Sequence, residues 1–171
     1  DTFIHTPIIR EEVRQLSPTE HAQVTVYLPA HDDRMLVRHF QRIKGVEWRV
    51  FSKHVKTPYQ QGNVHVHPVS ATQFLSSLEQ CLGVITAGGF ETAAETLFLG
   101  KKLLVIPMKG QYEQLCNAEA LRRMRVTTLD DVSKDFVERV ESWLANDEHI
   151  RVDFPDETSM IVRDILRRYQ K

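Results

Sequence analysis

The sequence predicts an α/β protein with a doubly wound parallel sheet. Short β-branched or aromatic runs alternate with segments whose apolar residues recur at helical spacing. One run, "KLLVIP" (102–107), is apolar along most of its length, which is typical of a strand covered on both faces. Such alternation forms βαβ units with right-handed crossovers, and ligands bind these sheets beyond the carboxyl ends of the strands.

Each predicted element has a local reason. The strands are rich in β-branched or apolar residues and end at proline, glycine or polar segments. They are expected at 22–30, 46–52, 64–66, 83–86 and 102–107. The helices carry apolar residues three and four positions apart. They are expected at 33–43, 71–81, 90–99, 112–124 and 130–146, with a last helix after Pro155. The polar stretch 53–63 is expected to be a loop.

The length of 171 residues favours one domain of ordinary size. We expect a lead-in segment at 1–20, the domain itself at 21–150, and a C-terminal helix within 151–171. That helix has an apolar stripe, which either packs on the domain or reaches toward a missing N-terminal domain. The stripe consists of Ile161, Val162, Ile165, Leu166 and Tyr169. Because the chain starts at Asp1 and not at methionine, we expect a piece of a longer protein.

Composition excludes several classes of protein. Hydrophobic residues make up 42% and charged residues 26%, values typical of a soluble globular protein. A net charge of −1 without a basic stripe gives no reason to expect nucleic acid. Cys81 and Cys116 are far apart, which argues against a disulfide or a zinc site and favours the cytoplasm. His65 and His67 share a strand face but have no third ligand, so we expect no metal.

The adjacent glycines Gly88 and Gly89 join a predicted strand to a predicted helix. A helix start offers unpaired backbone N–H groups and a partial positive charge, and glycines let an anion come close. Thr92 adds a hydroxyl donor, and Glu95 lies one turn on, where its carboxylate can accept hydrogen bonds from a ribose diol. The alternative is a tight corner followed by a solvated Glu95. The charge of Glu91 opposes an anion here unless the side chain points away.

A second polar cluster follows the strand at 102–107. Gln111, Glu113, Gln114 and Asn117 lie at a loop-to-helix junction, at the carboxyl end of the neighbouring strand. Several hydrogen-bonding side chains in one crevice suit a hydroxyl-rich ligand such as a sugar. An ordinary polar helix start explains the same residues equally well.

Three linked motifs carry a family resemblance. "GGFETAAE" (88–95) fits Gly-Gly-x-x-Ser/Thr-x-x-Glu, and it is followed by "LFLGKKLLVIP" and by "EQLCNA" (113–118). In order and spacing they resemble the C-terminal, donor-binding domain of GT-B glycosyltransferases. This family includes the lipid II-forming N-acetylglucosaminyltransferase and the UDP-glucuronosyltransferases. The close match covers about 64–121, and it implies a Rossmann-like domain that is one half of a GT-B fold.

The resemblance assigns parts of a UDP-sugar to residues of this chain. It implies that Gly88, Gly89 and Thr92 hold the diphosphate and that Glu95 binds the ribose hydroxyls. In relatives the base packs near a loop that corresponds here to "HPVS" (67–70), so the backbone of Val69 is the candidate for base binding. The sequence departs from the family after its first strand, where "PAHDD" (29–33) replaces a glycine-rich loop. His31 can substitute there as a hydrogen-bond donor, but a solvated loop histidine is the favoured interpretation.

For the donor sugar, the resemblance implies contacts from the polar cluster at the start of helix 112–124. The residues are Gln111, Glu113, Gln114 and Asn117, of which Asn117 also supports the loop. The resemblance further implies a missing N-terminal domain that binds the acceptor and supplies the catalytic base, so no catalytic residue is assigned in this chain. No cofactor or metal is expected, because the helix start stabilises the leaving diphosphate. Peripheral membrane contact through the missing domain is a further expectation.

The function predicted from the sequence is donor binding in an inverting glycosyltransferase that transfers a hexosyl group. A UDP-sugar 2-epimerase uses the same fold and remains an alternative. A non-catalytic nucleotide-binding or regulatory module is a third interpretation.

Overall fold

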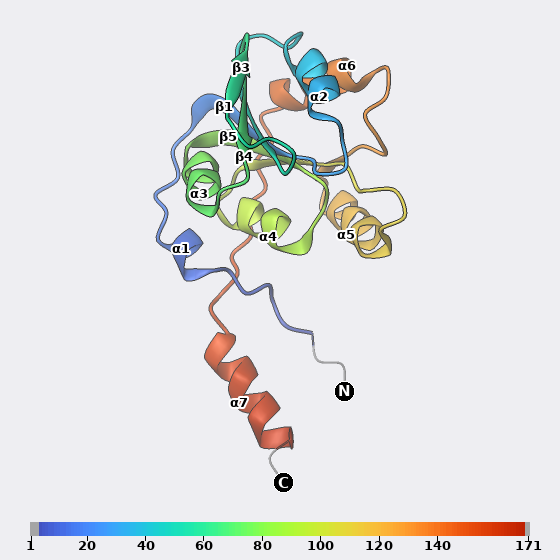
Figure 1. Cartoon of the computed structure of the whole chain (residues 1–171). Helices are drawn as coiled ribbons and strands as arrows, with labels where there is room; N and C mark the ends of the chain where they lie inside the picture. The colour runs from blue at the N-terminus through green and yellow to red at the C-terminus, as the bar shows by residue number, and fades with distance from the viewer. Residues whose placement is uncertain (1–3, 170–171) are drawn as a thin grey trace.

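The computed structural model describes residues 4–169, which form one seven-stranded sheet between layers of helices (Figure 1). The strand order is β3-β4-β2-β1-β5-β6-β7. Every neighbouring pair is parallel except β3 with β4. The order reverses at β1, from which the chain first builds outward to β4 and then crosses back to β5. This confirms the doubly wound α/β fold.

The elements follow the predicted alternation of strands and helices. The strands are β1 His21–Tyr27, β2 Glu47–Ser52, β3 Tyr59–Gln61, β4 Val64–Pro68, β5 Cys81–Thr86, β6 Lys102–Val105 and β7 Thr127–Thr128. The helices are α1 Glu11–Arg14, α2 Asp33–Phe40, α3 Ala71–Gln80, α4 Phe90–Phe98, α5 Tyr112–Arg123, α6 Phe136–Ala145 and α7 Thr158–Tyr169.

Two local predictions were wrong, and one short strand was not predicted. The stretch 53–63 is not only a loop, because β3 folds back on β4 as an antiparallel hairpin around Gly62, whose φ is 58°. The two-residue strand β7 is too short to give a sequence pattern. Helix α6 begins at Phe136 and not near 130, because the polar run before it forms turns in which Ser133 hydrogen-bonds the Asp135 carboxylate.

Strand alternation builds two apolar cores, one on each face of the sheet. On β5, Ile85 joins the core beneath α2 and α6, whereas Val84 joins the core beneath α1, α3, α4 and α5. The first core contains Phe40 stacked on Trp48, with ring centroids 4.3 Å apart. Both faces of the central strands are therefore covered by helices, as the continuous apolar run in β6 predicted.

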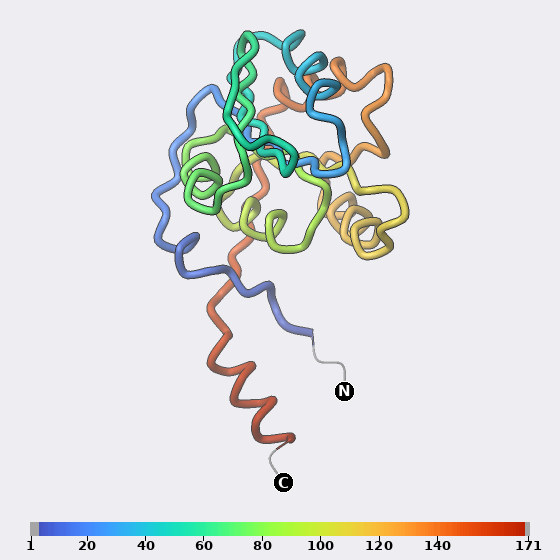
Figure 2. Tube along the Cα trace, in the orientation of Figure 1, coloured from blue at the N-terminus to red at the C-terminus, as the bar shows by residue number. Residues whose placement is uncertain are grey.

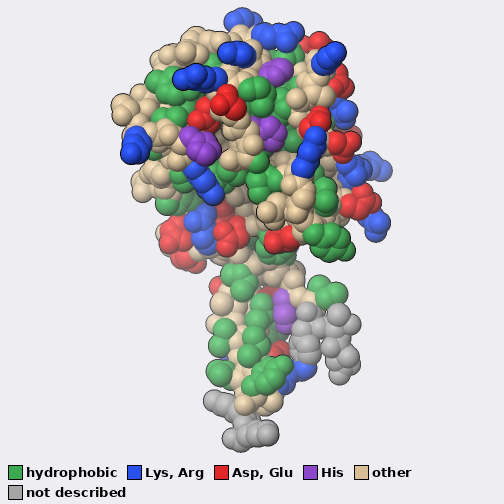
Figure 3. Space-filling model, turned by 45° about the vertical axis from the view of Figure 1, so that its right-hand side comes forward, with side chains coloured by type: hydrophobic (Ala, Val, Ile, Leu, Met, Phe, Trp, Pro, Cys, Tyr) green, Lys and Arg blue, Asp and Glu red, His purple; other side chains and the backbone are tan. Residues whose placement is uncertain are grey.

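The two ends of the described chain leave the domain on the same side (Figure 2). Before α7 the chain returns to α4, where the Val152 N–H donates to the Leu97 carbonyl at 3.1 Å. Helix α7 then projects away from the sheet and has no buried residue. Packing of α7 on the domain, one of the two expected arrangements, is therefore wrong. Apolar side chains are exposed along α7 (Figure 3). Among the described residues, no helix has the length and apolar character that crossing a membrane requires.

Candidate functional site

The two adjacent glycines have different physical roles. Gly88 has a φ of 81°, and a Cβ built there would lie 2.9 Å from Val105 Cγ1, so both its conformation and its packing require glycine. Gly89 has an ordinary φ of −60°, and a Cβ there would meet no atom within 4 Å. Gly88 thus makes the corner at the end of β5, whereas Gly89 leaves open space above the start of α4.

The start of α4 carries no side-chain cap. The first intrahelical hydrogen bond of this turn, from the Ala93 N–H to the Gly89 carbonyl, is long at 3.4 Å. The N–H groups of residues 90–92 come before it and have no earlier carbonyl within the helix. They present donors and the positive end of the helix dipole to the space over Gly89. Glu91 in this turn is exposed, so its side chain can point away from an anion.

The second polar cluster packs directly on the glycine turn. Asn117 Nδ2 donates to the Gly88 carbonyl oxygen at 3.1 Å. Gln114 Oε1 accepts from the Met108 N–H at 3.0 Å, which fixes the loop between β6 and α5. Gln111 and Glu113 are exposed at the start of α5. The structure therefore brings the two motifs together, with Asn117 bracing the turn. Sugar contacts by these four residues stay a prediction.

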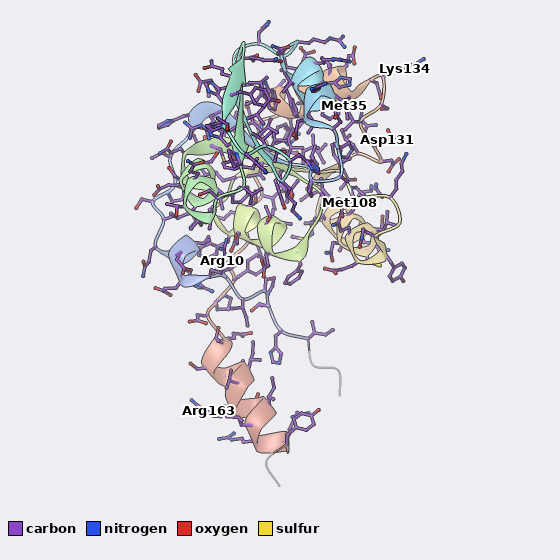
Figure 4. The ribbon with its side chains drawn as sticks, in the orientation of Figure 1. Arg10, Met35, Met108, Asp131, Lys134 and Arg163 are labelled. Atoms are coloured by element: carbon purple, nitrogen blue, oxygen red, sulfur yellow. The ribbon has the colours of Figure 1, made fainter. Side chains whose placement is uncertain are left out.

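Glu95 differs from the solvated helix residue that was one of the expectations. Its side chain is only 4% exposed, and its two carboxylate oxygens accept from Arg10 Nε at 2.6 Å and Arg10 Nη2 at 2.9 Å. Arg10 precedes α1 and lies between α1 and α4 (Figure 4). The hydrogen bond with Glu95 is the largest cause of a raised Arg10 pKa. Ribose binding by Glu95 stays a prediction, and it now requires Arg10 to share or release the carboxylate.

Three loops at the carboxyl ends of β1, β6 and β7 enclose a hollow of about 480 Å³. Met35, Met108 and Asp131, which line it, lie on one side of the molecule (Figure 4). His31 also lines it, and its buried Nδ1 has no hydrogen-bond partner among the described residues. Burial lowers the His31 pKa. His31 is thus half-buried and not a solvated loop residue.

At Val69, the candidate for base binding, one of the two backbone polar groups is already hydrogen-bonded. The Val69 N–H donates to the Ser52 carbonyl at 3.2 Å, while its side chain is 50% exposed beyond the end of β4. Any backbone contact to a base must therefore use the Val69 carbonyl. Within residues 4–169, no group of three or more metal-ligating side chains is placed to hold a metal ion.

Some of these residues carried no signal in the sequence. Arg10 is 85 positions from Glu95, and no spacing rule links them. The hollow beside His31 is assembled from three separate loops, so its members form no motif. The order of the sheet, which brings the ends of β1, β6 and β7 to one edge, was the only available hint.

Comparisons with known proteins agree with this geometry. A family model described as glycosyl transferase family 1 matches residues 1–146. The solved kitacinnamycin glycotransferase is similar, with a TM-score of 0.57, 22% identity, and coverage of 82% of this chain and 40% of that chain. Spinosyn forosaminyltransferase SpnP has a TM-score of 0.57, 18% identity, and coverage of 95% and 43%. Glycosyltransferase VinC in complex with DTDP has a TM-score of 0.57, 14% identity, and coverage of 94% and 45%.

No curated protein matches this chain at a significant level. At the identities above, the similarity to solved structures shows the fold, which is Rossmann-like. The chain spans less than half the length of each of these three structures. The family model, in contrast, covers most of the sequence and includes both motifs of the candidate site. The chain therefore belongs to glycosyl transferase family 1.

Proposed function

We propose that this chain is the nucleotide-sugar-binding half of an inverting, GT-B-type glycosyltransferase that uses a UDP-sugar and transfers a hexosyl group. The observation that carries the proposal is the uncapped start of α4, which faces open space over Gly89 and is braced by Asn117 from the second motif. Family membership supports it. A similar structure is described as a complex with DTDP, so a thymidine diphosphate sugar is the rival donor.

The chemistry follows from the helix start. When the sugar leaves, negative charge develops on the diphosphate oxygen that was bonded to it. Backbone N–H groups and the helix dipole are already aimed at the space over Gly89, so they can stabilise that charge without reorganising. Thr92 is half-buried in the first turn of α4, and its hydroxyl is a further donor. A metal ion is not needed for this role.

The remaining parts of the enzyme lie outside this chain. We propose that an N-terminal domain binds the acceptor and supplies the catalytic base, and that α7 packs against it through its exposed apolar side chains. The narrower likeness to the lipid II-forming and glucuronosyl enzymes, the cytoplasmic location and peripheral membrane contact belong to the same proposal.

Glu95 makes the identity of the nucleoside testable. A ribose offers a 2′,3′-diol to a carboxylate, whereas a 2′-deoxyribose has no diol. If Glu95 binds the diol while Arg10 holds its other lone pairs, UDP binds more tightly than dUDP, which differs from it only by the missing 2′-hydroxyl. That difference must then shrink in Glu95→Gln.

Calorimetric titration of the chain with UDP and with ADP tests the proposal. We expect a UDP dissociation constant of about 1 mM or tighter, weakened in Thr92→Val and in Gly89→Ala. The Gly89→Ala change adds a Cβ only to the open space, so the fold is kept. Thr57→Val, at an exposed loop position, is the matched control. If UDP, dTDP and ADP all fail to bind, the proposal is contradicted and a non-catalytic module is favoured.

The full-length protein decides between the enzyme classes. Incubated with radiolabelled UDP-sugars, a transferase moves label to a lipid or glycan. A change only in the stereochemistry of the donor identifies a 2-epimerase instead.

A further inference from the structure

A second open groove lies on the other half of the sheet, away from the glycine turn. It has a volume of about 480 Å³. Helix α3 packs on β1 and β5, and its Phe74 also covers Phe51 at the end of β2, with ring centroids 5.2 Å apart. The groove lies beyond this contact, between α3 and the same face of β2 and β4. The groove is lined by Glu47, Arg49, Phe51, His65, His67, Thr72, Gln73 and Ser76.

The strand register places an arginine and two histidines side by side. Arg49 pairs with His65, and Phe51 pairs with His67, in the parallel ladder between β2 and β4. Directly paired residues share a face of the sheet, with side chains about 5 Å apart. The Phe51 and His67 rings are stacked, with centroids 5.7 Å apart, which holds the imidazole in place. The groove is therefore a built arrangement of an arginine and two histidines.

The arginine of the groove has no direct partner. The Arg49 side chain makes no ion pair or hydrogen bond among the described residues, although it is half-buried. Burial, then Arg49, then His65 lower the His67 pKa. The carboxylate among the lining residues, Glu47, lies at the start of β2, two residues before Arg49.

Helix α3 completes the groove with neutral donors. Thr72 and Ser76 are one helical turn apart and bring two hydroxyl groups, and Gln73 brings an amide. Ser76 Oγ accepts a long hydrogen bond from Gln80 Nε2 at 3.4 Å, which leaves its proton free to donate. Apart from Glu47, the polar lining consists of groups that can donate to an acceptor-rich ligand.

We propose that this groove binds the tetrahedral oxyanion of a small phosphate ester, at a site separate from the glycine turn. An arginine fork with imidazole and hydroxyl donors matches the geometry and charge of phosphate. The bound anion pairs with the Arg49 guanidinium, which has no ion-pair partner among the described residues. The volume suits a small soluble molecule. This proposal does not depend on the proposed transferase function.

Titration of the chain with inorganic phosphate, followed by NMR of the histidine imidazoles, tests the proposal. We expect saturable shifts at His65 and His67. Arg49→Gln weakens binding at least about tenfold, whereas Glu47→Gln strengthens it. Arg38→Gln, an exposed arginine on α2, is the charge-matched control and leaves binding unchanged. Amide spectra verify that each variant is folded. The proposal is overturned if the imidazole shifts do not saturate, or if Arg49→Gln binds phosphate as tightly as the wild type.

Sulfate provides a second measurement, because its charge is constant between neutral and mildly acidic pH. The charged groups that face His67 are Glu47 and Arg49 on β2 and His65 on β4, and α3 contributes only neutral side chains. A bound anion favours the protonated imidazole, so by linkage sulfate binds more tightly at mildly acidic pH than at neutral pH. Replacement of His67 by Gln must reduce that dependence. Sulfate binding that is the same at both pH values contradicts a role for His67.

Discussion

The ion pair between Arg10 and Glu95 gives the sharpest prediction about stability. In Arg10→Met the stem is kept and the guanidinium is lost, so a carboxylate that is only 4% exposed loses its partner. Breaking a buried pair in this way costs about 3–5 kcal/mol. Because the Arg10 side chain is 45% exposed, water can enter where it was, and we expect about 2 kcal/mol. That corresponds to a fall of about 4–8 °C in Tm.

Urea denaturation of matched variants measures the effect. Arg123→Met, which breaks an exposed i,i+4 pair with Glu119, is the control and changes stability by less than about 0.5 kcal/mol. The double variant Arg10→Met/Glu95→Leu removes the unpaired carboxylate, so it is expected to be more stable than Arg10→Met alone. An Arg10→Met protein as stable as the wild type refutes the reasoning, because the buried carboxylate then needs no partner.

Three further predictions follow from the same structure. Gly88→Ala lowers the free energy of unfolding by about 1–2 kcal/mol or more, because the Gly88 φ is positive and Val105 is close. Gly89→Ala changes the free energy of unfolding by less than about 0.5 kcal/mol, because a Cβ there meets no atom. Equal effects of the two variants in urea denaturation contradict this prediction. Deletion of 158–171 leaves Tm within about 2 °C, because α7 buries no residue, and a larger fall shows that α7 packs on the domain. Burial lowers the pKa of His31 and His39, so the unfolded chain binds protons first and stability falls as pH drops below about 6.5. Replacing His31 and His39 by Gln reduces this loss of stability at acidic pH. A double variant whose stability has the same pH dependence as the wild type contradicts the prediction.

The sequence predicted those features that depend on local periodicity. The βαβ order and the strand-to-helix turn at Gly88 follow from residues that are neighbours in the chain. The same holds for the helix start beside Asn117, because the two motifs end adjacent strands of one parallel sheet. The sequence placed the second cluster at the end of the neighbouring strand, and the structure joins the two motifs there through the hydrogen bond from Asn117 to the Gly88 carbonyl.

Features that depend on distant parts of the chain were not predicted. The partner of Glu95 comes from a lead-in segment whose sequence mixes apolar and charged residues. The burial of His31 depends on loops that follow β6 and β7, and β7 itself is only two residues long. In both cases tertiary contacts decided what the local pattern could not. The hairpin of β3 is different, because its partner β4 follows directly in the chain and the two-residue turn Gly62-Asn63 is a hairpin signal that the loop prediction overlooked.

The central claim is that the backbone amides at the start of α4 hold a diphosphate. NMR mapping of amide shifts during a UDP titration tests it most directly, because it reports where the ligand binds as well as whether it binds. We expect the largest shifts at residues 89–92, together with the Asn117 side-chain amide that braces the turn. Largest shifts at any other surface, or amides at 89–92 that stay unperturbed while UDP binds, contradict it.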